Sequence, residues 1–202
     1  MHKKYLSYFL VSAWCISLSL GFYQLVEYGL TEGSADHSVA TWPASLHWPA
    51  KERKSVLVLN LHPLCPCSRA TVRELRQIME QYSTDVQLLV FAYIPDLDDK
   101  ADWESHDYIE TTLKQMPSTI WEWDEKGHNA LQLGAHTSGD LRLFDSKRNL
   151  IFSGGITPSR GHEGPSIGKE SIINYLENRE AVQRTAPVFG CPIQDGDIDD
   201  RI

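Results

Sequence analysis

Apolar residues in the middle of the chain occur first in continuous runs and then at helical spacing, which predicts alternating strands and helices. Residues 55–61 (SVLVLNL) and 86–94 (VQLLVFAYI) are runs of β-branched and aliphatic residues, typical of strands buried on both faces of a parallel sheet. Between them, residues 67–82 place apolar side chains three and four positions apart, as an amphipathic helix does. The pattern predicts a strand–helix–strand unit with parallel strands.

Weaker patterns fill the second half of the chain. Helices are expected at 105–116, 125–133 and 169–180, and further strands at 120–123, 140–145 and 150–153. The last two strands flank the polar residues 146–149, an arrangement that predicts a β-hairpin. Taken in order, these elements predict an α/β domain with a central mixed sheet flanked by helices.

Residues 5–26 form an apolar segment without a charge, bounded by Lys4 and Glu27. A helix of this length extends about 33 Å, enough to cross a hydrocarbon core of about 30 Å. The lysines before it favour a cytoplasmic N-terminus, so we expect an uncleaved signal-anchor that spans the inner (cytoplasmic) membrane once. A signal peptide cleaved after Ala40 is the alternative. Both interpretations place the domain in the periplasm or at the cell exterior, where disulfides persist.

The chain is therefore expected to have four segments. They are a cytoplasmic N-terminus with a transmembrane helix at 1–28, a tether at 29–52, a folded domain at 53–182 and a C-terminal tail at 183–202. The tether is predicted because its residues show no sustained period and include two Trp-Pro pairs. The net charge of −8 argues against nucleic-acid partners, because phosphates require a basic surface.

The candidate chemistry lies at the junction between the first strand and the first helix of the domain, where the chain reads Cys65-Pro66-Cys67. Proline suits the first turn of a helix, which places Cys65 near the N-cap and Cys67 inside the first turn. Free N–H groups and the helix dipole stabilise a thiolate there. We expect a redox couple in which Cys65 is the more exposed nucleophile and Cys67 its partner. A static disulfide or two unrelated thiols are the structural alternatives.

Three strings of residues resemble those of membrane-anchored bacterial thioredoxin-like proteins of the RedB type. They are HPLCPCSRA at 62–70, TSG at 137–139 and GGITPSRGH at 154–162. The resemblance covers about residues 52–181 and implies a thioredoxin-like fold, thiol–disulfide oxidoreductase activity and no cofactor. It departs from the thioredoxin pattern in two ways, because one residue rather than two separates the cysteines and Thr137 stands where relatives have a cis-proline.

The same resemblance suggests which residues would surround the cysteines. Pro66, Thr137 and Ser138 would contact the client, a protein with a dithiol or disulfide. Arg160 and His162 would lie near the site, because both ends of the hairpin face the cysteine loop, and they would stabilise a thiolate or move its proton. The ordinary alternative is a surface ion pair for Arg160 and a loop position for His162.

Two further residues are candidates for auxiliary roles. His62 lies three positions before the first cysteine and would tune its pKa or act as a ligand, unless it is simply a strand-end residue. Cys191 follows the last predicted helix by a stretch long enough to return to the cysteine pair, where it would act as a resolving thiol. A tail thiol that is free or pairs elsewhere is the alternative.

These features favour a membrane-anchored, extracytoplasmic thiol–disulfide oxidoreductase that exchanges its Cys65/Cys67 couple with a protein client. The alternative is a copper-binding or metal-delivery module for a membrane metalloenzyme. Its ligands would be Cys65, Cys67 and His162, because thiolate and imidazole ligands suit Cu(I).

Overall fold

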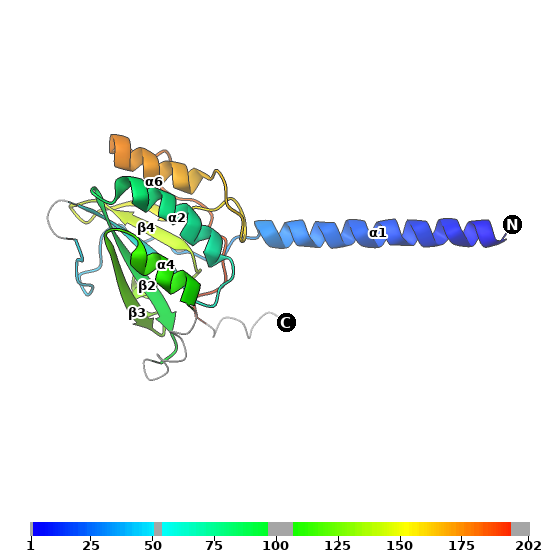
Figure 1. Cartoon of the computed structure of the whole chain (residues 1–202), viewed down its shortest axis with the longest axis horizontal. Coiled ribbons are helices and arrows are strands. Elements are labelled where there is room, and N and C mark those ends of the chain that lie inside the picture. Colours follow the sequence, from blue (N-terminus) through cyan, green and yellow to red (C-terminus); the bar gives the residue numbers. More distant parts are fainter. Residues whose placement is uncertain (1, 51–53, 97–106, 195–202) are drawn as a thin grey trace. The chain divides into compact units, whose positions relative to one another are not determined.

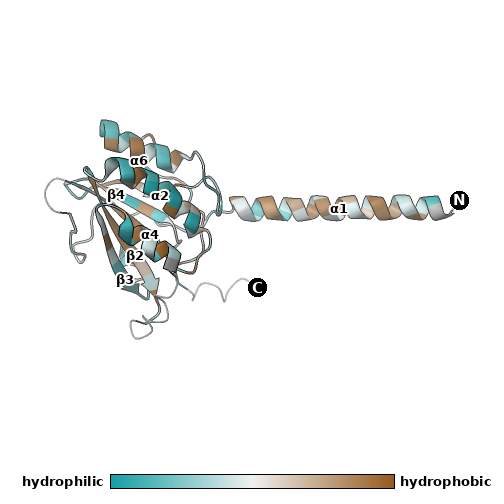
Figure 2. Ribbon diagram, in the orientation of Figure 1, coloured by the Kyte–Doolittle hydropathy of each residue, from teal (hydrophilic) through white to brown (hydrophobic). Residues whose placement is uncertain are grey.

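A computed structural model of the chain describes residues 2–50, 54–96 and 107–194. It divides into two compact units, Met1–Thr31 and Glu32–Ile202. The first unit is helix α1 (His2–Leu30). Among the described residues, one helical span, Lys4–Leu30, is long and apolar enough to cross a bilayer, and an N-terminal signal sequence has the same properties. Apolar residues recur along the whole length of α1 (Figure 2).

The second unit is built on a five-stranded mixed sheet. Its strands are β1 (Ser55–Leu61), β2 (Val86–Ile94), β3 (Thr119–Glu125), β4 (Asp140–Phe144) and β5 (Leu150–Gly154). They lie in the order β3-β2-β1-β4-β5, with β1 parallel to β2, β2 parallel to β3, and β4 antiparallel to both of its neighbours. The sheet confirms the predicted parallel unit and hairpin. Every residue of β1 is buried, which explains its apolar run at 56–59.

Three helices cover one face of the sheet: α2 (Ser68–Tyr82), α4 (Asp107–Gln115) and α6 (Ile167–Asn178), while α5 (His128–Gln132) is short. Figure 1 shows α2 between α4 and α6. The apolar stripe of α2 packs on alternate residues of β1, such as Leu57 and Leu59, to form the main core. The order of strands and helices confirms the predicted thioredoxin-like fold. The first two residues of the helix predicted at 105–116 lie outside the described residues.

The opposite face of the sheet is covered by the segment that precedes the domain, and this corrects the predicted tether. Trp42 is 6% exposed and packs with Val56, Val58 and Phe144. Backbone hydrogen bonds join Trp42 N to Arg148 O at 2.9 Å and Leu150 N to Ala40 O at 2.9 Å. A sheet that is apolar on both faces needs a second cover, which residues 42–50 provide together with Leu133. Residues 51–52 of the predicted tether lie outside the described part of the chain.

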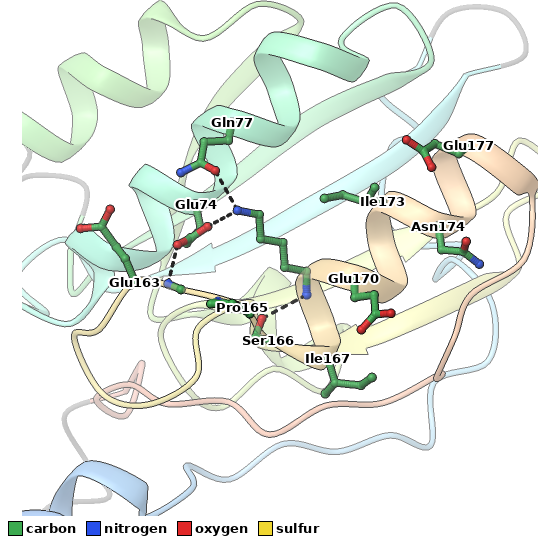
Figure 3. Close-up of a pocket in the computed structure, with 12 residues that line it drawn as sticks. Glu74, Gln77, Glu163, Pro165, Ser166, Ile167, Glu170, Ile173, Asn174 and Glu177 are labelled. Atoms are coloured by element: carbon green, nitrogen blue, oxygen red, sulfur yellow. Dashed lines mark hydrogen bonds and ion pairs between the residues drawn. The ribbon is translucent and has the colours of Figure 1, made fainter.

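A buried ion pair joins α2 to α6 and holds the loop that follows β5. Glu74 is 2% exposed, and its side chain accepts from Lys169 Nζ and, at 2.7 Å, from Gly164 N. Lys169 Nζ donates a further bond to Gln77 Oε1 at 2.8 Å. Figure 3 shows these bonds at the edge of an open hollow of about 1000 Å³. None of the residues that line it is a cysteine.

Candidate redox site

The cysteine loop is a pair of tight turns between β1 and α2. Cys65 N donates to His62 O at 3.0 Å, and Ser68 N donates to Cys65 O at 3.1 Å. Helix α2 begins at Ser68, so Cys67 is the N-cap residue and Pro66 stands one position before it. The helix was predicted from residue 67 and begins at Ser68, because Pro66 and Cys67 belong to the second of these turns rather than to the first helical turn.

Cys65 is the most buried of the three cysteines outside α1, so the prediction that it is the more exposed thiol was wrong. Its exposed fraction is 2%, whereas Cys67 and Cys191 are partly exposed. The neighbouring Leu64 is 47% exposed. Cys65 is buried because a segment far along the chain lies across it.

That segment is the end of the predicted C-terminal tail. After α6 the chain runs back beside β5, where Gly155 N donates to Pro187 O at 3.1 Å. It then forms an antiparallel bridge between Thr137 and Pro192. Two backbone bonds flank the bridge, from Ser138 N to Cys191 O at 2.8 Å and from Ile193 N to His136 O at 2.9 Å. Residues 183–194 of the tail are thus packed on the domain, while 195–202 lie outside the described residues.

This path brings Cys191 to the cysteine loop, as the sequence analysis allowed. The Sγ atoms of Cys65 and Cys191 are 3.0 Å apart, within hydrogen-bond distance, and Cys191 N donates to Cys65 Sγ at 3.4 Å. All three sulfur atoms, with that of Cys67, lie within 4.8 Å of one another. The site is a cluster of three thiols drawn from the two ends of the folded domain.

The surroundings of the cluster assign the negative charge to Cys65. The hydrogen bond from the Cys191 thiol lowers the pKa of Cys65 to about 4, with smaller contributions from Cys191 N–H and the Ser68 hydroxyl, against the opposing effect of burial. Its donation to Cys65 raises the pKa of Cys191, and burial and the Cys65 charge also raise it. Burial and the same charge raise the pKa of Cys67. Cys65 is therefore the thiolate of the reduced cluster.

Ser138 ties the predicted client-binding residues to the cysteine loop. Its hydroxyl accepts from His62 N at 2.8 Å and lies 2.9 Å from the Ser68 hydroxyl. Thr137 is buried and donates to Ser34 O at 2.7 Å. The backbone of Thr137 and Ser138 already pairs with the tail, so it is occupied by the chain itself.

The two predicted histidines lie in different surroundings. His62 is 7% exposed, accepts from Leu64 N at 3.2 Å and stacks on Tyr93 with ring centroids 5.1 Å apart. It therefore shapes the cysteine loop from inside. His162 is exposed, and its Nδ1 lies 2.7 Å from Arg160 O. Among the described residues it does not belong to the thiol cluster, so Cys191 replaces it in the predicted metal-ligand set.

Arg160 approaches the cluster from the loop that follows β5. Its guanidinium donates to Gly190 O, which directly precedes Cys191. The positive charge of Arg160 acts to lower the pKa of both Cys67 and Cys191, although other effects outweigh it. The role of Arg160 beside a thiolate stays a prediction.

Sequence reasoning missed the residues that hold the tail in place. A Cβ atom on Gly190 would lie 1.9 Å from Ser138 O, so glycine is required for this close approach. Ile193 is 2% exposed and packs with Tyr93, Ala130 and Ala135. The glycine before Cys191 and the aliphatic residue after it were the available signals.

A mixed sheet of this order, with cysteines where β1 meets α2, defines a protein of thioredoxin-like fold with a three-thiol site. No protein-family model matches the chain, and no curated protein sequence matches it. Among solved structures, an uncharacterized conserved protein from Geobacillus kaustophilus is 16% identical, with TM-score 0.57 over 82% of this chain and 94% of that protein. A hypothetical protein from Sinorhizobium meliloti is 17% identical, with TM-score 0.56 over the same shares of each chain. At these identities, the two similarities show the fold alone.

Proposed function

We propose that the protein is a thiol–disulfide oxidoreductase, anchored to the membrane through residues 5–26, whose domain exchanges disulfides with protein clients outside the cytoplasm. The observation that carries the proposal is the 3.0 Å approach of Cys191 Sγ to Cys65 Sγ, beside a pKa of Cys65 that is lowered to about 4. A thiolate is the attacking species in disulfide exchange, and a second thiol within reach resolves the intermediate.

The charges around the cluster favour a defined order of steps. The Cys65 thiolate attacks a client disulfide, one client sulfur leaves as a thiolate, and a Cys65–client mixed disulfide forms. Cys65 is then neutral, so the two effects of its charge that raise the pKa of Cys191 are lost. The nearby Arg160 cation then favours the Cys191 thiolate, which attacks Cys65 Sγ and releases the second client sulfur. The client is reduced, and Cys65 and Cys191 are left as a disulfide.

The choice of Cys191 as the first partner of Cys65 differs from the Cys65/Cys67 couple that the sequence favours. A bridge between residues two apart closes a very small ring and is strained, whereas Cys191 approaches from a separate segment. Cys67 also lies within 4.8 Å of both sulfurs. It therefore serves as the third thiol, to which the disulfide can be passed.

A redox titration of the full-length protein in detergent tests the proposal. The protein is equilibrated with dithiothreitol or glutathione buffers, its thiols are trapped by alkylation, and disulfide-linked peptides are identified by mass spectrometry. We expect Cys65 and Cys191 to be oxidised together as a two-electron couple that persists in Cys67→Ser. A link between Cys65 and Cys67 in the wild type would support the sequence-based couple instead. Thiols that stay reduced at every potential would contradict the function.

A second candidate function is Cu(I) binding, which the three clustered sulfur atoms favour. Thiolates are soft ligands suited to Cu(I), and Cys65, Cys67 and Cys191 would hold the ion. The Cys67→Ser variant separates the two functions. Loss of one ligand would weaken Cu(I) binding by about tenfold or more in an anaerobic competition titration with a chelating dye. An oxidoreductase retains its Cys65–Cys191 couple in the same variant.

A further inference from the structure

The side chain of Ile193 packs in a small buried cluster with Tyr93, Ala130 and Ala135, and the space that it occupies among them is here called the Ile193 pocket. Cys191 and Ile193 lie on either side of the bridge at Pro192, and both side chains contact the domain, Cys191 at Cys65 and Ile193 in this pocket. Ile193 is 2% exposed, while Pro192 between them is exposed. The pocket thus lies at a fixed separation from the thiol cluster.

Apart from these two side chains, residues 191–193 are held to the domain by main-chain hydrogen bonds. Ser138 N donates to Cys191 O at 2.8 Å, and Ile193 N donates to His136 O at 2.9 Å. Any extended peptide offers the same carbonyl and N–H groups. Selectivity among client segments must therefore come from their side chains. In the tail, the side chains that face the domain are those of the cysteine and of the residue two positions later.

We propose that the Ile193 pocket is a specificity subsite for an aliphatic side chain two residues after the reactive cysteine of an extended client segment. The chain's own Gly190–Ile193 strand occupies the subsite in the absence of a client. The proposal rests on the proposed function, because it names the client segment that Cys65 accepts. Client and tail compete for this one position. The tail leaves as a client segment binds, and after the mixed disulfide has formed it displaces that segment, so that Cys191 can attack Cys65 Sγ.

Two synthetic peptides test the subsite without altering the protein. The first carries the tail sequence VFGCPIQ (residues 188–194), with its cysteine in a mixed disulfide with glutathione. The second is identical except that alanine replaces the isoleucine. With reduced full-length protein in detergent, we expect the isoleucine peptide to be reduced at least tenfold faster, because its side chain is buried on binding. In each reaction the peptide disulfide gains two electrons and the Cys65–Cys191 pair loses them.

Ile193→Ala tests the competition between tail and client. This variant weakens the resident strand, so we expect the isoleucine peptide to react severalfold faster than it does with the wild type. Val182→Ala is the matched control, because Val182 is an exposed aliphatic residue of the segment that follows α6 and its replacement should leave the rate unchanged. The ratio of the two peptide rates within one protein is insensitive to a general loss of folded protein.

The outcomes separate the subsite from the function on which it rests. Equal rates for the two peptides, with ready reduction of both, would overturn the subsite and leave the oxidoreductase function in place. An absence of reaction with both peptides and with glutathione disulfide would overturn the function and the subsite together. A wild-type preference for the isoleucine peptide that disappears in Ile193→Ala would overturn the role of the pocket itself.

Discussion

Cys65 is buried, yet its surroundings favour the charged form of its thiol. Burial alone raises the pKa of a cysteine, so the lowered pKa of Cys65 depends on the donors that face it. The main donor is Cys191, which lies in the tail rather than in the cysteine loop. The charge of Cys65 therefore depends on a residue of the C-terminal segment, far along the chain from the cysteine loop.

This dependence predicts how the thiolate titrates. In the reduced wild type we expect thiolate absorbance near 240 nm to persist well below pH 7, since the pKa of Cys65 is lowered to about 4. Cys191→Ala removes the largest cause of the shift and should move the titration upward by at least about one pH unit. Cys65→Ala is the control and should abolish the low-pH step. A first step near pH 8.5 in the wild type would contradict the assignment of the thiolate.

At the scale of elements, the cover of the second sheet face has a testable energetic role. Trp42 packs edge-on against Trp48 and Phe144, with ring centroids 5.1 and 5.2 Å apart, and its Nε1 donates to Leu46 O at 2.9 Å. Trp42→Ala would leave a large cavity, and we expect the free energy of unfolding to fall by about 3–5 kcal/mol. Urea unfolding followed by circular dichroism measures it.

The half-buried Trp48 provides a graded control for this substitution. Trp48→Ala removes the same kind of side chain from a more exposed position, so its cost should be smaller. A cost below about 1 kcal/mol for Trp42→Ala would mean that residues 32–50 contribute little to the folded domain.

Elements differ in how well the sequence predicts them, for physical reasons. β1 and β2 were predicted at their observed bounds, because burial on both faces leaves a continuous apolar run. The packing of the N-terminal segment was not predicted, because a segment that packs through a few scattered side chains such as Trp42 and Trp48 shows no period. The bridge at Pro192 was missed for a related reason, since main-chain pairing leaves little trace in the side-chain pattern. Because this pairing of the tail was not predicted, Cys65 was expected to be exposed.

At the scale of the whole molecule, two units of different character share one chain. The folded unit holds the three thiols, and α1 supplies an exposed apolar helix. In the proposed function, attachment to a bilayer would confine the domain to clients at that surface and so raise their effective concentration. This arrangement requires that α1 stay attached and that the domain lie outside the cytoplasm.

Labelling of single cysteines in spheroplasts of a Gram-negative host tests both requirements. In a background with the natural cysteines replaced by serine, Val182→Cys provides an exposed thiol on the domain, and His2→Cys provides one before the apolar segment. We expect a membrane-impermeant maleimide to label Val182→Cys in intact spheroplasts. It should label His2→Cys only after the spheroplasts are lysed, because the lysines at 3 and 4 keep the N-terminus inside. The opposite labelling would reverse the orientation. An intact mass equal to that of residues 41–202 would show cleavage after Ala40, and the domain would then act as a free periplasmic protein.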